Sequence, residues 1–338
     1  ILGRIELGRE ERATLRSGNC WGAKMLAGDM AALQLIVNPA AGRGAGVRAT
    51  PQIEHWLHEL DVAYDLVHTE RPGHAIELAS AAARNGYGAA VAVGGDGTAN
   101  EVLNGLMQAQ ASGQCLPLGI LPVGTGNDFG HGIGVPHDLQ EACRCLKRGH
   151  RRWIDVGRVS GGQWAEGRYV GNGVGIGFDV TVTLEAKKLT WASGALAYVI
   201  AVLKTLFLYY RAPLITVQAD GEVRQKHYLM ISAMNGQRFG GAFYTAPHAR
   251  PDDGQFDLVL AQEVSRPAML ALVGRYMRGT QLSHPKIEAL HARRIHIQAE
   301  GGLNSHADGE VFMIDGRTLE IEVLPHQIEV ICEPEELV

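Results

Sequence analysis

Three glycine-bearing segments in the first half of the sequence combine the residue types that hold phosphate groups. They are residues 38–44, residues 94–98, which contain Asp96, and residues 122–128, which end in Asp128. Glycine lets backbone N–H groups approach a phosphate, and a helix N-terminus behind the loop adds a partial positive charge. One such loop alone would more simply be a tight turn. Three of them with two acids predict a phosphate site in which Mg²⁺ separates carboxylate from phosphate.

These segments follow predicted strands, which is where a parallel sheet binds its ligands. Short apolar runs at 33–37, 64–68, 89–93 and 118–121 alternate with helical patterns. That alternation is typical of a parallel sheet covered by helices. Ligands of such sheets bind outside the carboxyl ends of the strands. We therefore predict an N-terminal α/β domain, a doubly wound parallel sheet with its phosphate site at that edge.

Capping residues predict two helix starts in this domain. Thr50 followed by Pro51 is a standard start signal for the helix after the first strand. Thr98 and Glu101 have the spacing of a capping box, which predicts a helix beginning directly behind residues 94–97. The sequence has no Gly-Lys pair, and no strand here ends in G-x-G-x-x-G. Neither a P-loop nor a dinucleotide fingerprint is therefore present.

From about residue 152 the pattern changes to shorter strands with Asp-Gly pairs, which are turn chemistry in β-rich structure. Strands are expected at 153–159, 168–174, 214–219, 228–234, 256–261, 295–299 and 318–323. The Asp-Gly pairs begin at Asp220, Asp253, Asp308 and Asp315. We predict a C-terminal, mostly antiparallel β domain with helices near 193–209 and 266–278.

The composition agrees with two globular domains and argues against nucleic-acid binding. The 338 residues correspond to about two domains at roughly 150 residues each. Lys and Arg number 31 against 36 Asp and Glu, so the net charge is −5 and no basic domain is indicated. The 43 glycines are about twice the usual share. Five cysteines without a Cys-x-x-Cys pair favour a reducing, cytoplasmic setting.

These patterns divide the chain into four parts. Residues 1–30 are an N-terminal extension or leader, 31–151 the α/β domain, 152–325 the β domain, and 326–338 a tail that could pack on the first domain. The apolar stretch at 195–209 is shorter than the roughly 20 residues that a membrane span needs. It is expected to be a buried or interfacial helix.

Three ordered motifs carry a resemblance to a known family. They are Asn38-Pro39-Ala40-Ala41-Gly42, Gly94-Gly95-Asp96-Gly97-Thr98-Ala99-Asn100-Glu101-Val102 and Leu121-Pro122-Val123-Gly124-Thr125-Gly126-Asn127-Asp128-Phe129. Together they resemble the diacylglycerol kinase catalytic domain, with the soluble bacterial lipid kinases as the nearest members. Sphingosine kinases and, more distantly, NAD kinase are related. The resemblance extends from about residue 33 to 332.

The resemblance implies that ATP binds between the two domains. The implied ATP contacts are Asn38, Pro39, Ala40, Ala41, Gly42, Thr69, Gly94, Gly95, Asp96, Gly97, Thr98, Ala99, Asn100 and Thr125. Glu310, in Asp308-Gly309-Glu310, takes the place of the family's proposed general base, and Asp96 organises Mg²⁺ and phosphate. Read alone, Asp308-Gly309 is a hairpin turn followed by a solvated acid.

A further part of the resemblance concerns a structural metal. Residues 250–255 resemble the family's metal loop, in which an Asp side chain and backbone carbonyls hold Mg²⁺. Asp253 would supply the carboxylate, and Arg250 and Gln255 would supply carbonyl oxygens. Without the resemblance the same residues are an Asp-Gly turn.

The expected function is an ATP- and Mg²⁺-dependent kinase that phosphorylates the hydroxyl of a lipid at a membrane surface. An NAD kinase-like enzyme and a non-catalytic nucleotide-sensing protein of the same fold are the alternatives. The basic run at 147–152 is either a solvated connector or a contact for anionic headgroups. The expected partners are a lipid substrate, the inner face of a membrane through peripheral contact, and a second copy of the chain in a homodimer. No nucleic-acid partner is expected.

Overall fold

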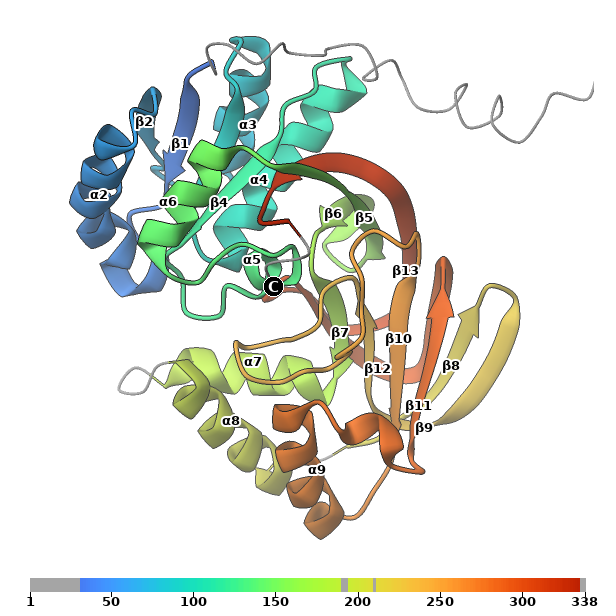
Figure 1. The fold of residues 1–338 in the computed structure, drawn as a ribbon. Coiled ribbons are helices and arrows are strands. Elements are labelled where there is room, and N and C mark those ends of the chain that lie inside the picture. Colours follow the sequence, from blue (N-terminus) through green and yellow to red (C-terminus); the bar gives the residue numbers. More distant parts are fainter. Residues whose placement is uncertain (1–30, 190–193, 209–210, 335–338) are drawn as a thin grey trace, which may run out of the picture.

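The first part of the molecule is a parallel sheet between helices, as predicted. The computed structural model describes residues 31–189, 194–208 and 211–334 (Figure 1). Four neighbouring parallel strands run in the order β4-β3-β1-β2. They are β1 (Leu33–Val37), β2 (Tyr64–His68), β3 (Ala89–Gly94) and β4 (Leu118–Pro122). Their apolar runs fill the centre of the first core, because a parallel sheet is buried on both faces.

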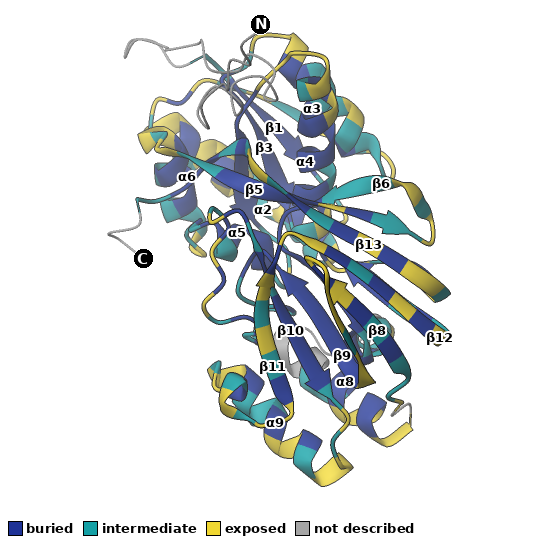
Figure 2. Cartoon of the chain, turned by 90° about the vertical axis from the view of Figure 1, so that its right-hand side faces the viewer, coloured by how far each residue is buried: buried dark blue, intermediate teal, exposed yellow. Residues whose placement is uncertain are grey.

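Helices cover both faces of this sheet. On one face α3 contacts α4, and α2 contacts α6 on the other (Figure 2). The helices are α2 (Ala41–Glu59), α3 (His74–Arg84), α4 (Asp96–Ala111), α5 (Asp128–Gly132) and α6 (Leu139–Arg148). Asp138 caps α6, since its side chain accepts a hydrogen bond from the backbone N–H of Glu141.

The predicted start of the first helix is wrong. Helix α2 begins at Ala41, well before Thr50, and Pro51 lies inside it. The Thr50 hydroxyl donates to the carbonyl of Gly46 on the preceding turn instead of capping a helix end. Residues 42–44 interrupt the helical geometry with three left-handed φ angles. The regular helix resumes after this kink, so Thr50 and Pro51 lie within a helix that has already begun.

The predicted capping box at the start of α4 is also wrong. Helix α4 begins at Asp96, and no side chain caps it. The Glu101 carboxylate accepts from the N–H groups of Gly73 and Ala75, so it serves the start of α3. Thr98 accepts from the side-chain amide of Asn38. Tertiary partners replaced both local hydrogen bonds.

The second part is mostly antiparallel β structure, also as predicted. Its strands are β5 (Arg151–Gly161), β6 (Trp164–Val170), β7 (Gly173–Gly177), β8 (Leu214–Ala219), β9 (Glu222–Met234), β10 (Phe256–Gln262), β11 (Ile287–Ala292), β12 (Arg294–Ala307) and β13 (Glu310–Ile331). The single strand expected at 168–174 is divided between β6 and β7, and β11 was not predicted. Helices α7 (Phe178–Lys188), α8 (Gly194–Leu208) and α9 (Arg266–Arg278) and the short η1 (Gln281–Ser283) complete this part.

Three of the four Asp-Gly pairs occur at turns. Asp220 and Asp308 have positive φ angles between β8 and β9 and between β12 and β13. Gly254 has a positive φ directly before β10. Asp315 does not end a strand: it lies within β13, where the register against β12 shifts. Asp-Gly pairs in this protein therefore occur in a β-bulge as well as in turns.

The long strand β13 joins the two parts. It pairs with β12 and β5, and near its end Val330 lies beside Leu118 of β4 in parallel register. Residues 328 and 330–332 belong to the core of the parallel sheet, so this segment packs on the first part. Strand β5 also begins in that core, through Ile154 and Val156. Among the described helices, none is long and apolar enough to cross a membrane.

Candidate active site

The three glycine loops meet at the carboxyl edge of the parallel sheet. Their strands β1, β3 and β4 are neighbours, so the loops must also be neighbours. The side-chain amide of Asn38 donates to the Thr98 hydroxyl over 3.0 Å. A Cβ atom on Gly124 would lie only 2.3 Å from the Cα of Gly95. The second and third loops therefore touch backbone to backbone, which only glycine permits.

The first loop has a backbone shape that suits an anion. Gly42, Arg43 and Gly44 have φ angles of 55°, 58° and 86°, two residues after the N-cap residue Ala40, which is in the right-handed region. Successive N–H groups in such mixed conformations form a concave anion site. The Arg43 guanidinium donates over 2.9 Å to the carbonyl of Leu189 after α7, which links this loop to the second part of the molecule.

Asp96 and Asp128 point their carboxylates at the same place. A Cβ on Gly126 would lie 2.9 Å from Asp96 Oδ2 and 3.2 Å from Asp128 Oδ2. Burial raises the pKa of Asp128 to about 7, and the Asp96 carboxylate adds to the shift. Burial also raises the pKa of Asp96, with a further contribution from the charge of Asp308. Two crowded carboxylates with raised pKa values form a donor set that suits Mg²⁺.

Arg238 and Gly241 fix the other oxygen of Asp128. The Arg238 Nε donates to Asp128 Oδ1 over 3.0 Å, and the backbone N–H of Gly241 donates to the same atom over 2.9 Å. Both residues lie between β9 and β10, so this contact spans the two parts. Burial, with a further contribution from the Arg238 charge, lowers the pKa of His131 to about 4. His131 is therefore neutral at physiological pH.

Asp308 ties the second part to the helix behind the phosphate loops. Its side chain is buried, and Oδ2 accepts from the Asn100 amide and the backbone N–H of Gly171, both over 2.8 Å. Oδ1 accepts from the N–H groups of Asn172 and Gly173 over 3.0 and 2.9 Å. Four donors on one carboxylate stabilise its charge. The turn at 308–309 is thereby fixed against α4.

Glu310 lies two residues beyond this anchored turn, and its side chain is 49% exposed. Its carboxylate pairs with Arg168 over 3.2 Å. The same guanidinium donates to the Asn100 side chain over 3.1 Å and lies over the Trp164 ring. Glu310 is therefore oriented by a cation that is itself fixed to α4, while half of its side chain faces solvent.

The other predicted nucleotide contacts have different surroundings. Thr69 lies at the carboxyl end of β2, where its N–H donates to the carbonyl of Val37. Thr125 is exposed at the tip of the third loop. Asn100 is buried, and its amide donates to Asp308 and to the carbonyl of Tyr169. Its side chain thus holds the two parts together, and a nucleotide contact through it stays a prediction.

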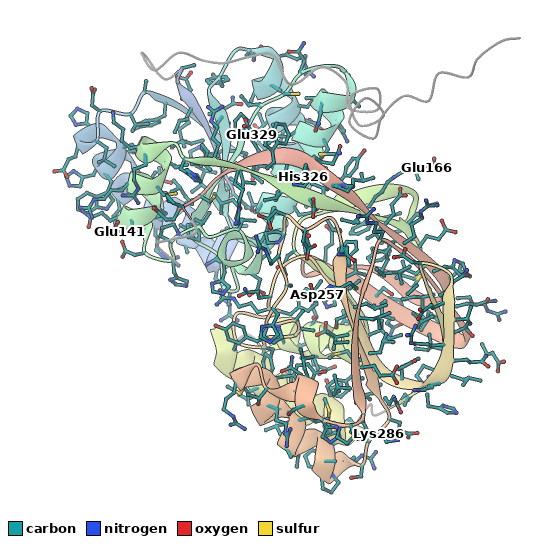
Figure 3. The ribbon with its side chains drawn as sticks, turned by 45° about the vertical axis from the view of Figure 1, so that its right-hand side comes forward. Glu141, Glu166, Asp257, Lys286, His326 and Glu329 are labelled. Carbon is teal, nitrogen blue, oxygen red and sulfur yellow. The ribbon has the colours of Figure 1, made fainter. Side chains whose placement is uncertain are left out.

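The predicted metal loop at 250–255 packs against Asp155 of β5. The N–H of Gly254 and the N–H of His326 donate to the two carboxylate oxygens of Asp155. Asp253 accepts from the N–H of Gln255. With His291 and Asp257, which is labelled in Figure 3, it belongs to a group whose ligand atoms all lie within 4.8 Å of one another. The Arg250 side chain pairs with Asp252 and offers no metal ligand.

The basic run at 147–152 serves mainly intramolecular contacts. Lys147 donates to the carbonyl of Asp61, and Arg148 pairs with Glu333. Arg151 and Arg152 lie near Glu329 and Asp252 at 3.6 and 3.8 Å. Because each of these cations contacts a group of the protein, the geometry favours the connector over a headgroup contact.

Sequence reasoning did not predict Arg238 or the pair of Asp179 and His306. Arg238 follows a strand by a few residues, and nothing in its sequence context signals that it reaches Asp128. The buried pair of Asp179 and His306, whose Oδ2 and Nε2 atoms are 2.7 Å apart, joins α7 to β12. A Cβ on Gly175 would lie within 2.4 Å of both atoms, so only glycine fits beside this pair. That glycine is the one feature of the sequence that could have indicated the pair.

Comparison with known proteins agrees with this architecture. Residues 32–159 match the diacylglycerol kinase catalytic domain, and residues 172–332 match the YegS C-terminal NAD kinase beta sandwich-like domain. The chain is therefore a lipid kinase in class. It belongs to the diacylglycerol kinase family, which argues against the NAD kinase-like alternative.

Individual relatives cover most of the chain. A diacylglycerol kinase of Mycobacterium tuberculosis is 28% identical over 281 residues, 81% of this chain and 87% of the relative. One from Staphylococcus aureus is 29% identical over 278 residues, 82% of this chain and 85% of the relative. A crystal structure of a candidate diacylglycerol kinase from Bacillus anthracis matches with a TM-score of 0.74 and 25% identity, covering 92% of this chain and 100% of that one.

Proposed function

We propose that this lipid kinase transfers the γ-phosphate of ATP to the hydroxyl of a lipid such as diacylglycerol, with Glu310 as general base. The observation that carries the proposal is the contact between Asp308 and Asn100. It fixes the Asp308-Gly309-Glu310 turn against the helix that begins at the phosphate loop. Glu310, two residues further on, would then act as the base from the second part beside the phosphate site of the first.

Different residues of this chain would have different roles in phosphoryl transfer. Backbone N–H groups of the glycine loops would hold the phosphates, and Arg238 holds Asp128 in place. Glu310 would accept the proton of the lipid hydroxyl as its oxygen attacks the γ-phosphorus and the bond to ADP breaks. Such a reaction mainly needs positioning, neutralised charge and an oriented base.

Asp96 and Asp128 are the residues that would hold Mg²⁺. Their Oδ2 atoms face each other across Gly126, and burial together with mutual repulsion raises the pKa of Asp128. A divalent cation would relieve that repulsion, and when bound it supplies charge neutralisation to the phosphates.

An apolar cavity in the second part supports a lipid as the acceptor. It lies among helices α7, α8 and α9, and its lining includes Phe178, Val182, Val202, Met269 and Val273. The polar groups of Asp179, Thr245 and Tyr276 also line it. Acyl chains suit such walls, whereas the phosphates of a dinucleotide do not. The cavity measures about 40 Å³ in this structure, so the three helices would have to move apart to admit a chain. The site of action would be the cytoplasmic face of a membrane.

The proposal is tested with Glu310→Gln. Transfer of labelled γ-phosphate to diacylglycerol, sphingoid-base and phosphatidylglycerol acceptors is measured, together with ATP binding by calorimetry. We expect the turnover number to fall roughly 10²- to 10⁴-fold while ATP binding persists, because the base is lost and the phosphate loops are intact.

The matched control is Glu320→Gln, an exposed glutamate further along β13. It should leave turnover unchanged. Unchanged turnover in Glu310→Gln would remove Glu310 from the mechanism, and absence of transfer to every lipid tested by the unaltered protein would overturn the lipid acceptor.

A further inference from the structure

Helices α8 and α9 form the end of the second part that lies farthest from the parallel sheet (Figure 1). They contact each other, and the Arg266 guanidinium at the start of α9 donates over 3.2 Å to the carbonyl of Leu206 near the end of α8. The two helices therefore present one joint outer surface.

This outer surface is unusually apolar. Among the described residues, eight large hydrophobic side chains are exposed, and five of them lie on these two helices. We call these five the α8–α9 surface: Leu203, Phe207, Leu208, Leu270 and Met277. Phe207 and Leu208 are each 62% exposed. Val47, Val223 and Ile314, the other three, occur singly on other elements, so clustering distinguishes this surface from ordinary exposed hydrophobics.

The inner faces of the same helices are apolar too. Val202 of α8 and Met269, Val273 and Tyr276 of α9 line the cavity assigned above to the lipid. A helix that is apolar on its inner and outer faces has an apolar environment on both. The α8–α9 surface is thus separated from the proposed lipid cavity by a single layer of helix.

The charge of this region is positive although the whole chain carries −5. Helix α8 contains Lys204, α9 contains Arg266, Arg275 and Arg278, and neither helix contains an acidic residue. Of the acids nearby, Glu185 on α7 pairs with Lys204, and Glu263 precedes α9. Arg278 is exposed on α9 beside the exposed Met277. Hydrophobic residues flanked by cations are the composition that binds an anionic lipid surface.

We propose that the α8–α9 surface is the membrane-docking surface of this protein and that its partner is an anionic lipid bilayer. The inference rests on the proposed function in one respect, namely that the acceptor is a lipid. When the α8–α9 surface is bound to the bilayer, the proposed lipid cavity lies next to the membrane that contains this acceptor. The exposed hydrophobic side chains enter the headgroup region, and Arg278 contacts anionic headgroups. A second copy of the chain fits less well, since it would bring like charges together.

The test is co-sedimentation with vesicles of phosphatidylcholine, with or without one quarter phosphatidylglycerol. The full chain is expected to bind the mixed vesicles more strongly. The double variant Phe207→Ser, Leu208→Ser should bind them at least about tenfold more weakly, because two large side chains no longer enter the interface. Arg278→Gln should reduce binding about fivefold, and only to the anionic vesicles.

The matched control is the double variant Val223→Ser, Ile314→Ser, which removes two equally exposed hydrophobic side chains elsewhere. It should bind vesicles like the unaltered protein. Circular dichroism and ATP binding confirm that each variant is folded. Equal binding by the Phe207/Leu208 variant and this control would overturn the proposal.

Two further readouts separate the remaining outcomes. If sedimentation velocity shows a dimer that Phe207→Ser, Leu208→Ser dissociates, with no vesicle binding by either protein, the surface is a subunit interface and the proposal is wrong. Vesicle binding requires no turnover, so it can succeed even if no lipid is phosphorylated. With dioctanoylglycerol in detergent micelles as acceptor, the Phe207/Leu208 variant should retain the turnover of the unaltered protein, and loss there would place the two residues in catalysis instead.

Discussion

Two regions of the molecule differ in how tightly their residues are held. One is the carboxyl edge of the parallel sheet, where the three glycine loops meet, which we call the phosphate edge. The other is the α8–α9 surface. At the phosphate edge, backbone touches backbone at Gly95 and Gly124, and Asp308 has four hydrogen-bond donors. On the α8–α9 surface the side chains of Phe207 and Leu208 project into solvent. One region is fixed in position by glycine and compensated charge, whereas the other consists of side chains that make few contacts within the protein.

This difference predicts where substitutions act. A change at the phosphate edge should reduce stability and activity together, because the same contacts position the loops and hold the two parts. A change on the α8–α9 surface should leave the free energy of unfolding within about 0.5 kcal/mol and alter only membrane binding. The experiments below probe the phosphate edge, in order of expected effect.

The largest effect is expected for Asp308→Asn. An amide keeps one acceptor oxygen and turns an NH₂ group toward the remaining donors, so at least two buried N–H groups lose their partner. Unpaired buried donors cost about 1–3 kcal/mol each, so we expect a loss of roughly 4 kcal/mol in urea unfolding. Glu310→Gln, two residues away and half exposed, should change stability by less than about 0.5 kcal/mol. Similar losses in both variants would contradict the contrast between the two acids.

A smaller effect is expected for Gly124→Ala. The added Cβ would lie 2.3 Å from the Cα of Gly95 and 2.7 Å from Asn127 Oδ1, so two loops must separate. We expect a loss of about 3 kcal/mol in unfolding free energy, together with weaker ATP binding.

Gly97→Ala is the matched control for the same loop region, since its Cβ would meet no atom within 4 Å. It lies in the first turn of α4, where alanine should stabilise by roughly 0.5–1 kcal/mol. If the two variants are equally stable, the close approach of the loops is not what the glycines provide.

The smallest effect concerns pH. The pKa of Asp128 is raised to about 7 in the folded protein, above its value of roughly 4 in an unfolded chain. The folded state therefore holds a proton that the unfolded state has released, and stability falls as pH rises between these values. Without Mg²⁺, we expect a loss of roughly 2–3 kcal/mol between pH 4.5 and 7 in urea titrations.

Asp128→Asn should flatten this dependence, because it removes both the titrating group and its repulsion with Asp96. Adding Mg²⁺ to the unaltered protein at pH 7 should restore part of the lost stability, in proportion to the occupancy of the site. A Mg²⁺ effect of the same size in Asp128→Asn would show that the cation binds elsewhere.

Sequence periodicity determined the secondary structure more reliably than the capping signals did. Strands β1 and β2 and helix α9 have the predicted bounds, because their apolar patterns were clear. Thr50 and Glu101, in contrast, were assigned local capping roles, and both bond to other groups. A capping motif reports what a side chain can bond locally. At Thr50 the helix continues through the motif and the hydroxyl bonds back to Gly46, whereas at Glu101 backbone donors of α3 replace the local bond.

By itself the sequence determined the two-part architecture, the three phosphate loops and the resemblance to lipid kinases. These follow from short-range patterns: glycine spacing, strand length and alternation with helices. Only the tertiary structure decided that Arg238 holds Asp128, that Asp308 anchors Asn100, and that Phe207 faces solvent while Val202 faces the cavity. The hydrogen-bonded residues are far apart in the sequence, and Val202 and Phe207 lie on one uniformly apolar helix. Their relation is therefore set by how the elements pack, which no local pattern records.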